Sequence, residues 1–116
     1  MRDFRRLDVW RDSIALGKAI YRLTEDFPTR ERFGLVAQMR SSVVSISSNV
    51  AEGAGRGSQK ELARFLRIAI GSTCELESQI ELAIRLGMMQ PSSEITAQVD
   101  RTRRRLIRLV TRIAAS

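Results

Sequence analysis

The amino-acid sequence predicts an all-α fold, an up-down-up-down bundle of four helices, and three observations lead to it. Apolar residues recur at alternating steps of three and four in four separate segments, which is the period of a helix with one buried face. Short connections containing Gly, Pro or Ser separate these segments, and no segment alternates with the two-residue period of a strand. A chain of 116 residues can bury one hydrophobic core, so residues 1–116 are expected to form a single domain.

The first two helices are separated by a short connection around Pro28. The first helix is expected to begin near Leu7 and to end before Pro28, with an apolar arc broad enough for more than one neighbour. Thr29 is expected to cap the second helix, which the charged residues 30–32 open. The glycines within residues 53–57 end that helix.

Serines mark the starts of the last two helices. Ser58 heads the sequence S-Q-K-E, a capping box in which Glu61 is expected to bond back to the cap, so the third helix begins directly after Ser58. Gly87 closes this helix. Ser92 or Ser93 is expected to cap the fourth helix.

The second helix carries a polar stripe beside its apolar one. At the spacing of one helical face lie Gln38, Ser42, Ser45, Asn49 and Glu52. Short Ser and Asn side chains suit close contact with another helix, although any one of them can instead face solvent or bond to its own backbone. Because Ser, Val, Ile and Asn are mediocre helix formers, tertiary packing has to hold this helix. We interpret the stripe as packing within the bundle and between subunits.

The charge balance points to anionic partners. The chain has 20 Lys and Arg against 13 Asp and Glu, a net charge of +7, which favours nucleic acid or an acidic protein surface without choosing between them. A basic face is expected on the fourth helix, formed by Arg101, Arg104, Arg105, Arg108 and Arg112. A second basic patch is expected near the N-terminus, formed by Arg2, Arg5 and Arg6.

Several classes of protein are disfavoured by what the chain lacks. It has no His and one Cys, Cys74, so neither the usual zinc sites nor an intrachain disulfide nor His-based acid-base chemistry can be built. The N-terminus is charged rather than signal-like, and no apolar run approaches the roughly 18 residues that span a bilayer. We therefore expect a cytoplasmic protein that does not enter a membrane.

An enzyme is the least favoured of three hypotheses. The glycines within residues 53–57 follow a helix rather than a strand and lack the G-K-[ST] ending of a P-loop, so a helix connector explains them better. Glu52, Glu75 and Glu77 could be imagined as a di-metal carboxylate site, but such sites use E-x-x-H pairs that a chain without His cannot supply. We expect no catalytic residues, metal or cofactor.

Long motifs in the first three helices resemble a known family. These motifs are L-D-V-W at 7–10, F-P-T-R-E-R-F-G-L-V-A-Q at 27–38, R-S-S-V-V-S-I-S-S-N-V-A-E-G-A-G-R-G-S at 40–58 and E-L-A-R-F-L-R-I-A-I-G-S-T-C-E-L-E-S-Q at 61–79. They resemble the bacterial four-helix-bundle proteins encoded in 23S ribosomal RNA intervening sequences, the S23 family, from Phe4 to about Gly87. Ser41 and Ser47 depart from it, because the family usually has Arg and Pro there.

The resemblance implies how the protein assembles more firmly than it implies a function. Members of the family look like bundles that associate as ring-shaped homopentamers, and no enzymatic activity comes with them. The related accessory variability determinant of diversity-generating retroelements is a basic pentameric barrel that binds nucleic acid and a reverse transcriptase. By resemblance, roles in buried polar packing or subunit contacts fall to Gln38, Ser45, Asn49, Glu52, Arg56, Glu75 and Glu77.

Two binding hypotheses remain. The first is a basic homo-oligomer, with a pentamer favoured, whose arginines bind RNA or DNA with little sequence preference or scaffold a nucleoprotein complex. The second is an interaction module that docks an acidic protein and has no nucleic-acid role, since the guanidinium fork also pairs well with carboxylates.

Overall fold

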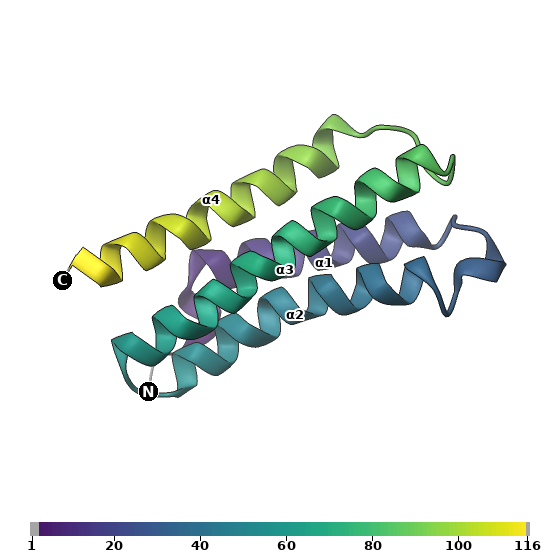
Figure 1. Ribbon diagram of the computed structural model, residues 1–116. Coiled ribbons are helices and arrows are strands. Elements are labelled where there is room, and N and C mark those ends of the chain that lie inside the picture. Colours follow the sequence, from purple (N-terminus) through teal and green to yellow (C-terminus); the bar gives the residue numbers. More distant parts are fainter. Residues whose placement is uncertain (1–2, 116) are drawn as a thin grey trace.

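A computed structural model describes residues 3–115, which are almost entirely helical (Figure 1). No strand occurs among these residues, so the prediction of an all-α fold with four helices is confirmed. None of the helices within residues 3–115 combines the length and the apolar composition needed to cross a bilayer. The helices are α1 (Asp8–Thr24), α2 (Leu35–Gly55), α3 (Gln59–Arg85) and α4 (Ser93–Ala115), with two short 3-10 helices, η1 (Phe4–Arg6) and η2 (Thr29–Glu31).

The second α-helix begins later than the sequence predicts. Thr29 opens the 3-10 turn η2 instead of capping α2, and the chain is interrupted at Gly34, whose φ of −105° and ψ of −112° are not helical. The Oε1 atom of Glu31 then accepts a hydrogen bond of 3.2 Å from the Leu35 amide, the first amide of α2. A carboxylate from the preceding turn thus satisfies a helix end that has no cap of its own.

The predicted starts of α3 and α4 are confirmed. The Ser58 hydroxyl accepts a hydrogen bond of 3.1 Å from the Glu61 amide, and the Ser92 hydroxyl accepts one of 3.2 Å from the Ile95 amide. The capping box is only half formed, because the Glu61 carboxylate pairs with Arg64 at 2.8 Å. The Glu61 carboxylate therefore pairs with the charged side chain one turn along the helix instead of bonding back to the cap residue.

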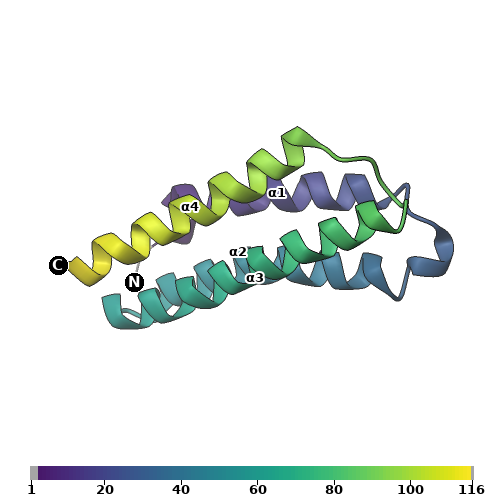
Figure 2. The same cartoon turned by 45° about the horizontal axis from the view of Figure 1, so that its top comes forward.

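Helices α2 and α3 form the most closely packed pair and lie side by side in both views (Figures 1 and 2). The α2 face toward the core is closed to solvent, with Met39, Ile46 and Val50 at 0% exposure. Near the turn between them the backbones approach so closely that a Cβ on Gly53 would lie 2.8 Å from the Phe65 Cβ. The smallest residue is therefore required where α2 meets the start of α3.

The two departures from the family pattern leave α2 intact. The helix is continuous over Leu35–Gly55, and Ser47 donates a hydrogen bond of 3.2 Å to the Val44 carbonyl. Ser41 is exposed on the outside of the helix. No proline kink or basic contact arises at either position.

Helix α4 is the least buried of the four. Its only buried residues are Val99, Thr102 and Leu106, and none of residues 107–115 is buried. The 3-10 helix η1 and the end of α4 lie at the end of the molecule that carries the α2–α3 turn (Figures 1 and 2). The C-terminal half of α4 is consequently an exposed rim beside the start of α1.

Candidate nucleic-acid interface

All five arginines of the predicted basic face are exposed on α4, but their surroundings differ. Arg104 pairs with Asp100 on the same helix at 2.7 Å, and Arg105 reaches Asp12 of α1 at 2.9 Å. Within residues 3–115, Arg101 and Arg108 have no ion pair. These two guanidinium groups carry charge that no neighbouring carboxylate offsets, which is the arrangement that attracts phosphate.

A sixth arginine of α4, Arg103, lies on the other side of the helix. Its guanidinium forms two hydrogen bonds of 3.2 Å to the Glu77 carboxylate of α3, and its side chain is only 20% exposed. The hydrogen bond to Glu77 raises the pKa of Arg103 above its ordinary value. The position of Arg103 on the inner side of α4 could be predicted from the sequence, since it lies four residues after Val99 and three before Leu106, both core positions. Arg103 therefore holds α4 to α3.

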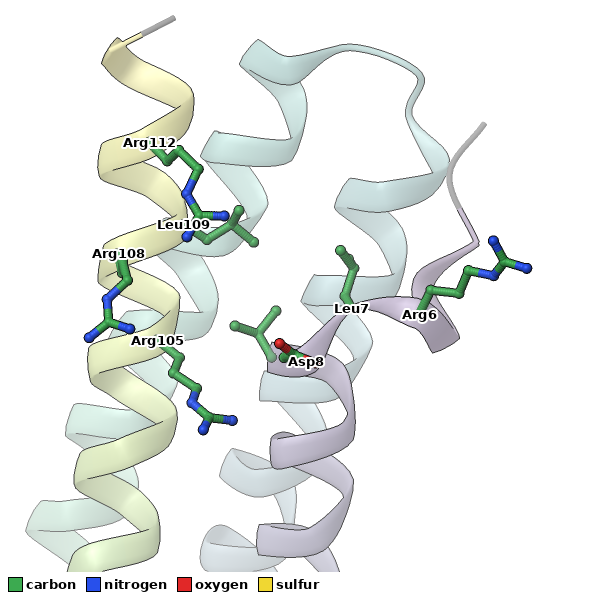
Figure 3. A pocket seen from close by; sticks show the side chains of 8 residues that line it. Arg6, Leu7, Asp8, Arg105, Arg108, Leu109 and Arg112 are labelled. Carbon is green, nitrogen blue, oxygen red and sulfur yellow. The ribbon is translucent and has the colours of Figure 1, made fainter.

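A cleft of about 340 Å³ separates the C-terminal half of α4 from the start of α1 (Figure 3). In Figure 3 the Arg105 side chain extends from α4 toward α1, whereas Arg6 points away from α4. Leu7, Val9 and Leu109 give the cleft an apolar wall, and guanidinium groups of α4 form its rim. Its lining consists of Arg6, Leu7, Asp8, Val9, Arg105, Arg108, Leu109 and Arg112.

The cleft is electropositive although two aspartates lie beside it. Asp8 pairs with Arg11, and Asp12 accepts both of its hydrogen bonds from the Nη1 atom of Arg105. The three lining arginines of α4 and Arg11, set against these two aspartates, leave a formal charge of +2; Arg6 is not counted because its side chain points away from α4 (Figure 3). The positive end of the α1 dipole adds to this potential because α1 begins at Asp8.

Only part of the predicted N-terminal patch joins this site. Arg6 lines the cleft, but Arg5 pairs with Asp3 at 3.4 Å and stacks 4.7 Å from the centre of the Phe4 ring. Arg2 lies outside the described residues. Arg6 is therefore the one described residue of the N-terminal patch that lines the cleft, and its side chain points away from α4 (Figure 3).

The polar stripe of α2 is partly buried between helices. The Ser45 hydroxyl lies 2.9 Å from the Ser72 hydroxyl of α3, and the Asn49 amide nitrogen donates to the Ser45 carbonyl at 2.8 Å and to its hydroxyl at 3.0 Å. Gln38 and Glu52, at the two ends of the stripe, are exposed. The centre of the stripe thus joins α2 to α3, whereas its ends face outward.

The remaining motif residues do not gather into one site. Arg56 pairs with Glu52 at 3.6 Å and lies 5.0 Å from the centre of the Phe65 ring, while Glu77 is bound by Arg103. Glu75 is exposed on α3. No three His, Cys, Asp or Glu side chains within residues 3–115 are arranged to hold a metal ion.

Comparison with known proteins supports the resemblance seen in the sequence. A search of curated proteins finds no match to the chain. A family model described as 23S rRNA-intervening sequence protein matches residues 5–108, which includes most of α4 as well as the first three helices. Because this match covers nearly the whole chain, the protein belongs to the 23S rRNA-intervening sequence protein family.

Proposed function

We propose that this protein is a non-enzymatic, basic, oligomeric bundle that binds RNA or DNA with little sequence preference. The observation that carries the proposal is the exposed arginine face of α4, where Arg101 and Arg108 have no carboxylate partner within residues 3–115. The family's description names a ribosomal RNA intervening sequence and no ligand, so RNA is simply the first nucleic acid to test. Because of this basic face, we include in the proposal a role like that of the accessory variability determinant of retroelements, which binds nucleic acid.

The arginines would act mainly by neutralising phosphates. Each contact releases condensed counterions, so the logarithm of the association constant falls with the logarithm of salt concentration by about 0.7 per phosphate on a single strand. None of the residues that line the cleft is aromatic, so stacking on bases contributes little there. Binding should therefore depend steeply on salt and weakly on sequence.

Fluorescence anisotropy with labelled single-stranded RNA at several salt concentrations tests this proposal. The R101Q/R108Q variant should bind more weakly and lose about 1.4 from the salt slope, two contacts at about 0.7 each. The matched control is R30Q/R67Q, which loses the same charge from two exposed arginines outside α4 and should retain most of the affinity. Absence of binding at low salt, or equal loss in both variants, would remove the α4 face from the proposal.

Binding of an acidic protein is the competing outcome. The same arginines can pair with carboxylates, and nothing in their spacing selects phosphate. A protein partner that is retained after nuclease treatment and lost in R101Q/R108Q would favour this second reading. In that case the anisotropy experiment should show no binding of RNA.

For the assembly, we propose that up-down-up-down bundles join through α2 into a ring, with five subunits favoured by the family resemblance. Among its 21 residues, α2 has only two charged residues, Arg40 and Glu52. Apart from Glu52, its exposed residues are uncharged, namely Ala37, Gln38, Ser41, Val44, Ser48 and Gly55. An exposed helix face with a single charge, in a chain that is 28% charged, is suited to contact with another subunit.

Two different apolar surfaces flank this face. On one side, Ile14, Gly17 and Tyr21 of α1 form a groove with α2 of about 280 Å³, which Val44 also lines. On α3, the exposed large hydrophobic residues are Ile68 and Leu82, and Leu86 follows directly after the helix. Contacts between two unlike surfaces are head-to-tail, and repeated head-to-tail contacts close into a ring when their rotation allows it.

Light scattering on nuclease-treated protein tests the assembly. The wild type should have the mass of a closed oligomer, and V44E should shift it toward the monomer because a charge would be buried in the contact. R101Q, which changes charge on α4, is the control and should keep the wild-type mass. A monomeric wild type at micromolar concentration would refute the ring.

A further inference from the structure

We propose that the cleft between α1 and α4, if the protein binds nucleic acid as proposed above, holds the terminal phosphate monoester of an RNA strand. The protein would then prefer phosphorylated strand ends to strands that end in hydroxyl groups. The exposed face of α4 supplies salt-dependent attraction for any strand, and the cleft adds recognition of the end.

Arg105 has the geometry for this role. Both of its hydrogen bonds to Asp12 are made by Nη1, at 2.9 and 3.1 Å, and no other hydrogen bond of Arg105 occurs within residues 3–115. Asp12 thus orients the guanidinium across the cleft while Nε and Nη2, the pair of donors that binds two oxygens of one phosphate, stay available. The side chain is held in place before a ligand arrives, which reduces the entropy lost on binding.

The charge of the cleft fits a monoester better than a diester. A terminal phosphate carries about −1.5 to −2 charges and three acceptor oxygens at neutral pH, whereas a phosphodiester carries a single charge. The formal charge of +2 at the cleft matches a monoester and exceeds what one diester can neutralise. Asp8 does not oppose the ligand strongly because Arg11 already pairs with it.

The size and the walls of the cleft fit a strand end rather than a duplex. A volume of about 340 Å³ lies at the lower end of small-ligand sites, enough for a phosphate and its sugar. Leu7 and Leu109 offer apolar surface to the sugar, and the lining contains no aromatic ring on which a base could stack. Recognition would therefore depend on the terminal phosphate and not on sequence.

The test compares RNA strands of one sequence and about 12 nucleotides, a length typical of single-strand sites, that end in phosphate or in hydroxyl. Fluorescence anisotropy is measured with the phosphate at either the 5′ or the 3′ end. For the wild type we expect about tenfold tighter binding of one phosphorylated strand, the effect of one added charge-assisted contact. Inorganic phosphate should compete with that strand more effectively than with the hydroxyl strand.

Two substitutions that preserve charge separate the cleft from the open face. R105K keeps the ion pair with Asp12 but lacks the planar fork, so the preference should fall to within about twofold. R101K changes an exposed arginine about one turn away on the same helix, outside the lining of the cleft, and should keep the full preference. Thermal melting of both variants checks that α4 is still docked.

The outcomes distinguish this inference from the broader function. Equal affinity for both kinds of strand, with affinity that still falls with salt, would overturn the cleft assignment and leave nucleic-acid binding standing. A preference that survives in R105K, or that R101K also abolishes, would likewise place end recognition outside the cleft. Failure of every strand to bind at low salt would overturn both proposals.

Discussion

Replacing Gly53 by Ala tests how closely α2 and α3 are packed. The added Cβ would lie 2.8 Å from the Phe65 Cβ and 3.3 Å from both the Cδ1 atom and the carbonyl oxygen of Leu62. Two carbons in contact prefer about 3.5 to 4.0 Å, so the helices must separate by roughly 1 Å at this point. Neither the Phe65 Cβ nor the Leu62 carbonyl is the end of a flexible side chain, so the backbone itself has to move.

Two opposing effects determine how much G53A changes the free energy of unfolding. Overpacking of a core by one carbon costs about 1 to 3 kcal/mol, while Ala in place of Gly inside a helix gains about 1 kcal/mol in propensity. The net loss of unfolding free energy for G53A should be about 0 to 2 kcal/mol. Gly55 is the matched control, because its Cβ would meet nothing within 4 Å, and G55A should be neutral or slightly stabilising.

Urea denaturation at one protein concentration measures both variants, since the stability of an oligomer depends on concentration. The difference between G53A and G55A removes most of the propensity term and should be about 1 to 3 kcal/mol in favour of G55A. If G53A were as stable as G55A, the close approach of α2 and α3 at this glycine would be refuted.

Three further predictions concern single interactions. R103M removes the contact with Glu77 and should cost about 1 kcal/mol in urea denaturation, because the half-exposed Glu77 regains water; R85M, whose partner Glu81 is also exposed, should cost less. S92A removes the cap of α4 and should lower the unfolding free energy by about 1 kcal/mol, whereas S93A should not. The Arg64 hydrogen bond lowers the pKa of Glu61 from its ordinary 4.5, so this pair stabilises the fold above pH 4.5 and its contribution disappears as the pH falls through the lowered pKa. E61Q should therefore make the free energy of unfolding depend less on pH in the acid range, and an unchanged pH dependence would contradict this.

Local features of this chain could be predicted from sequence, and features that depend on packing could not. The caps at Ser58 and Ser92 are bonds to amides three residues away, so the pattern of residues is sufficient to place them. The start of α2 was misplaced because Glu31 acts across Gly34, and a carboxylate in a short turn gives no capping pattern. The sequence showed which arginines of α4 share a face, yet the cleft depends on a pair, Asp12 and Arg105, that lies 93 residues apart.

The shallow burial of α4 links its stability to ligand binding and leads to a last prediction. None of residues 107–115 is buried, and this end of α4 meets α1 across the cleft, next to the ion pair between Arg105 and Asp12. A phosphate bound between Arg105 and Arg108 would add contacts that exist only when α4 is helical and docked, so it should favour that state by mass action. Hydrogen exchange of amides in residues 107–115 should therefore slow when RNA with a terminal phosphate binds, and slow less with hydroxyl-ended RNA at equal occupancy. Equal protection by the two strands would mean that the phosphate is held on the open face of α4, where it cannot couple that helix to α1.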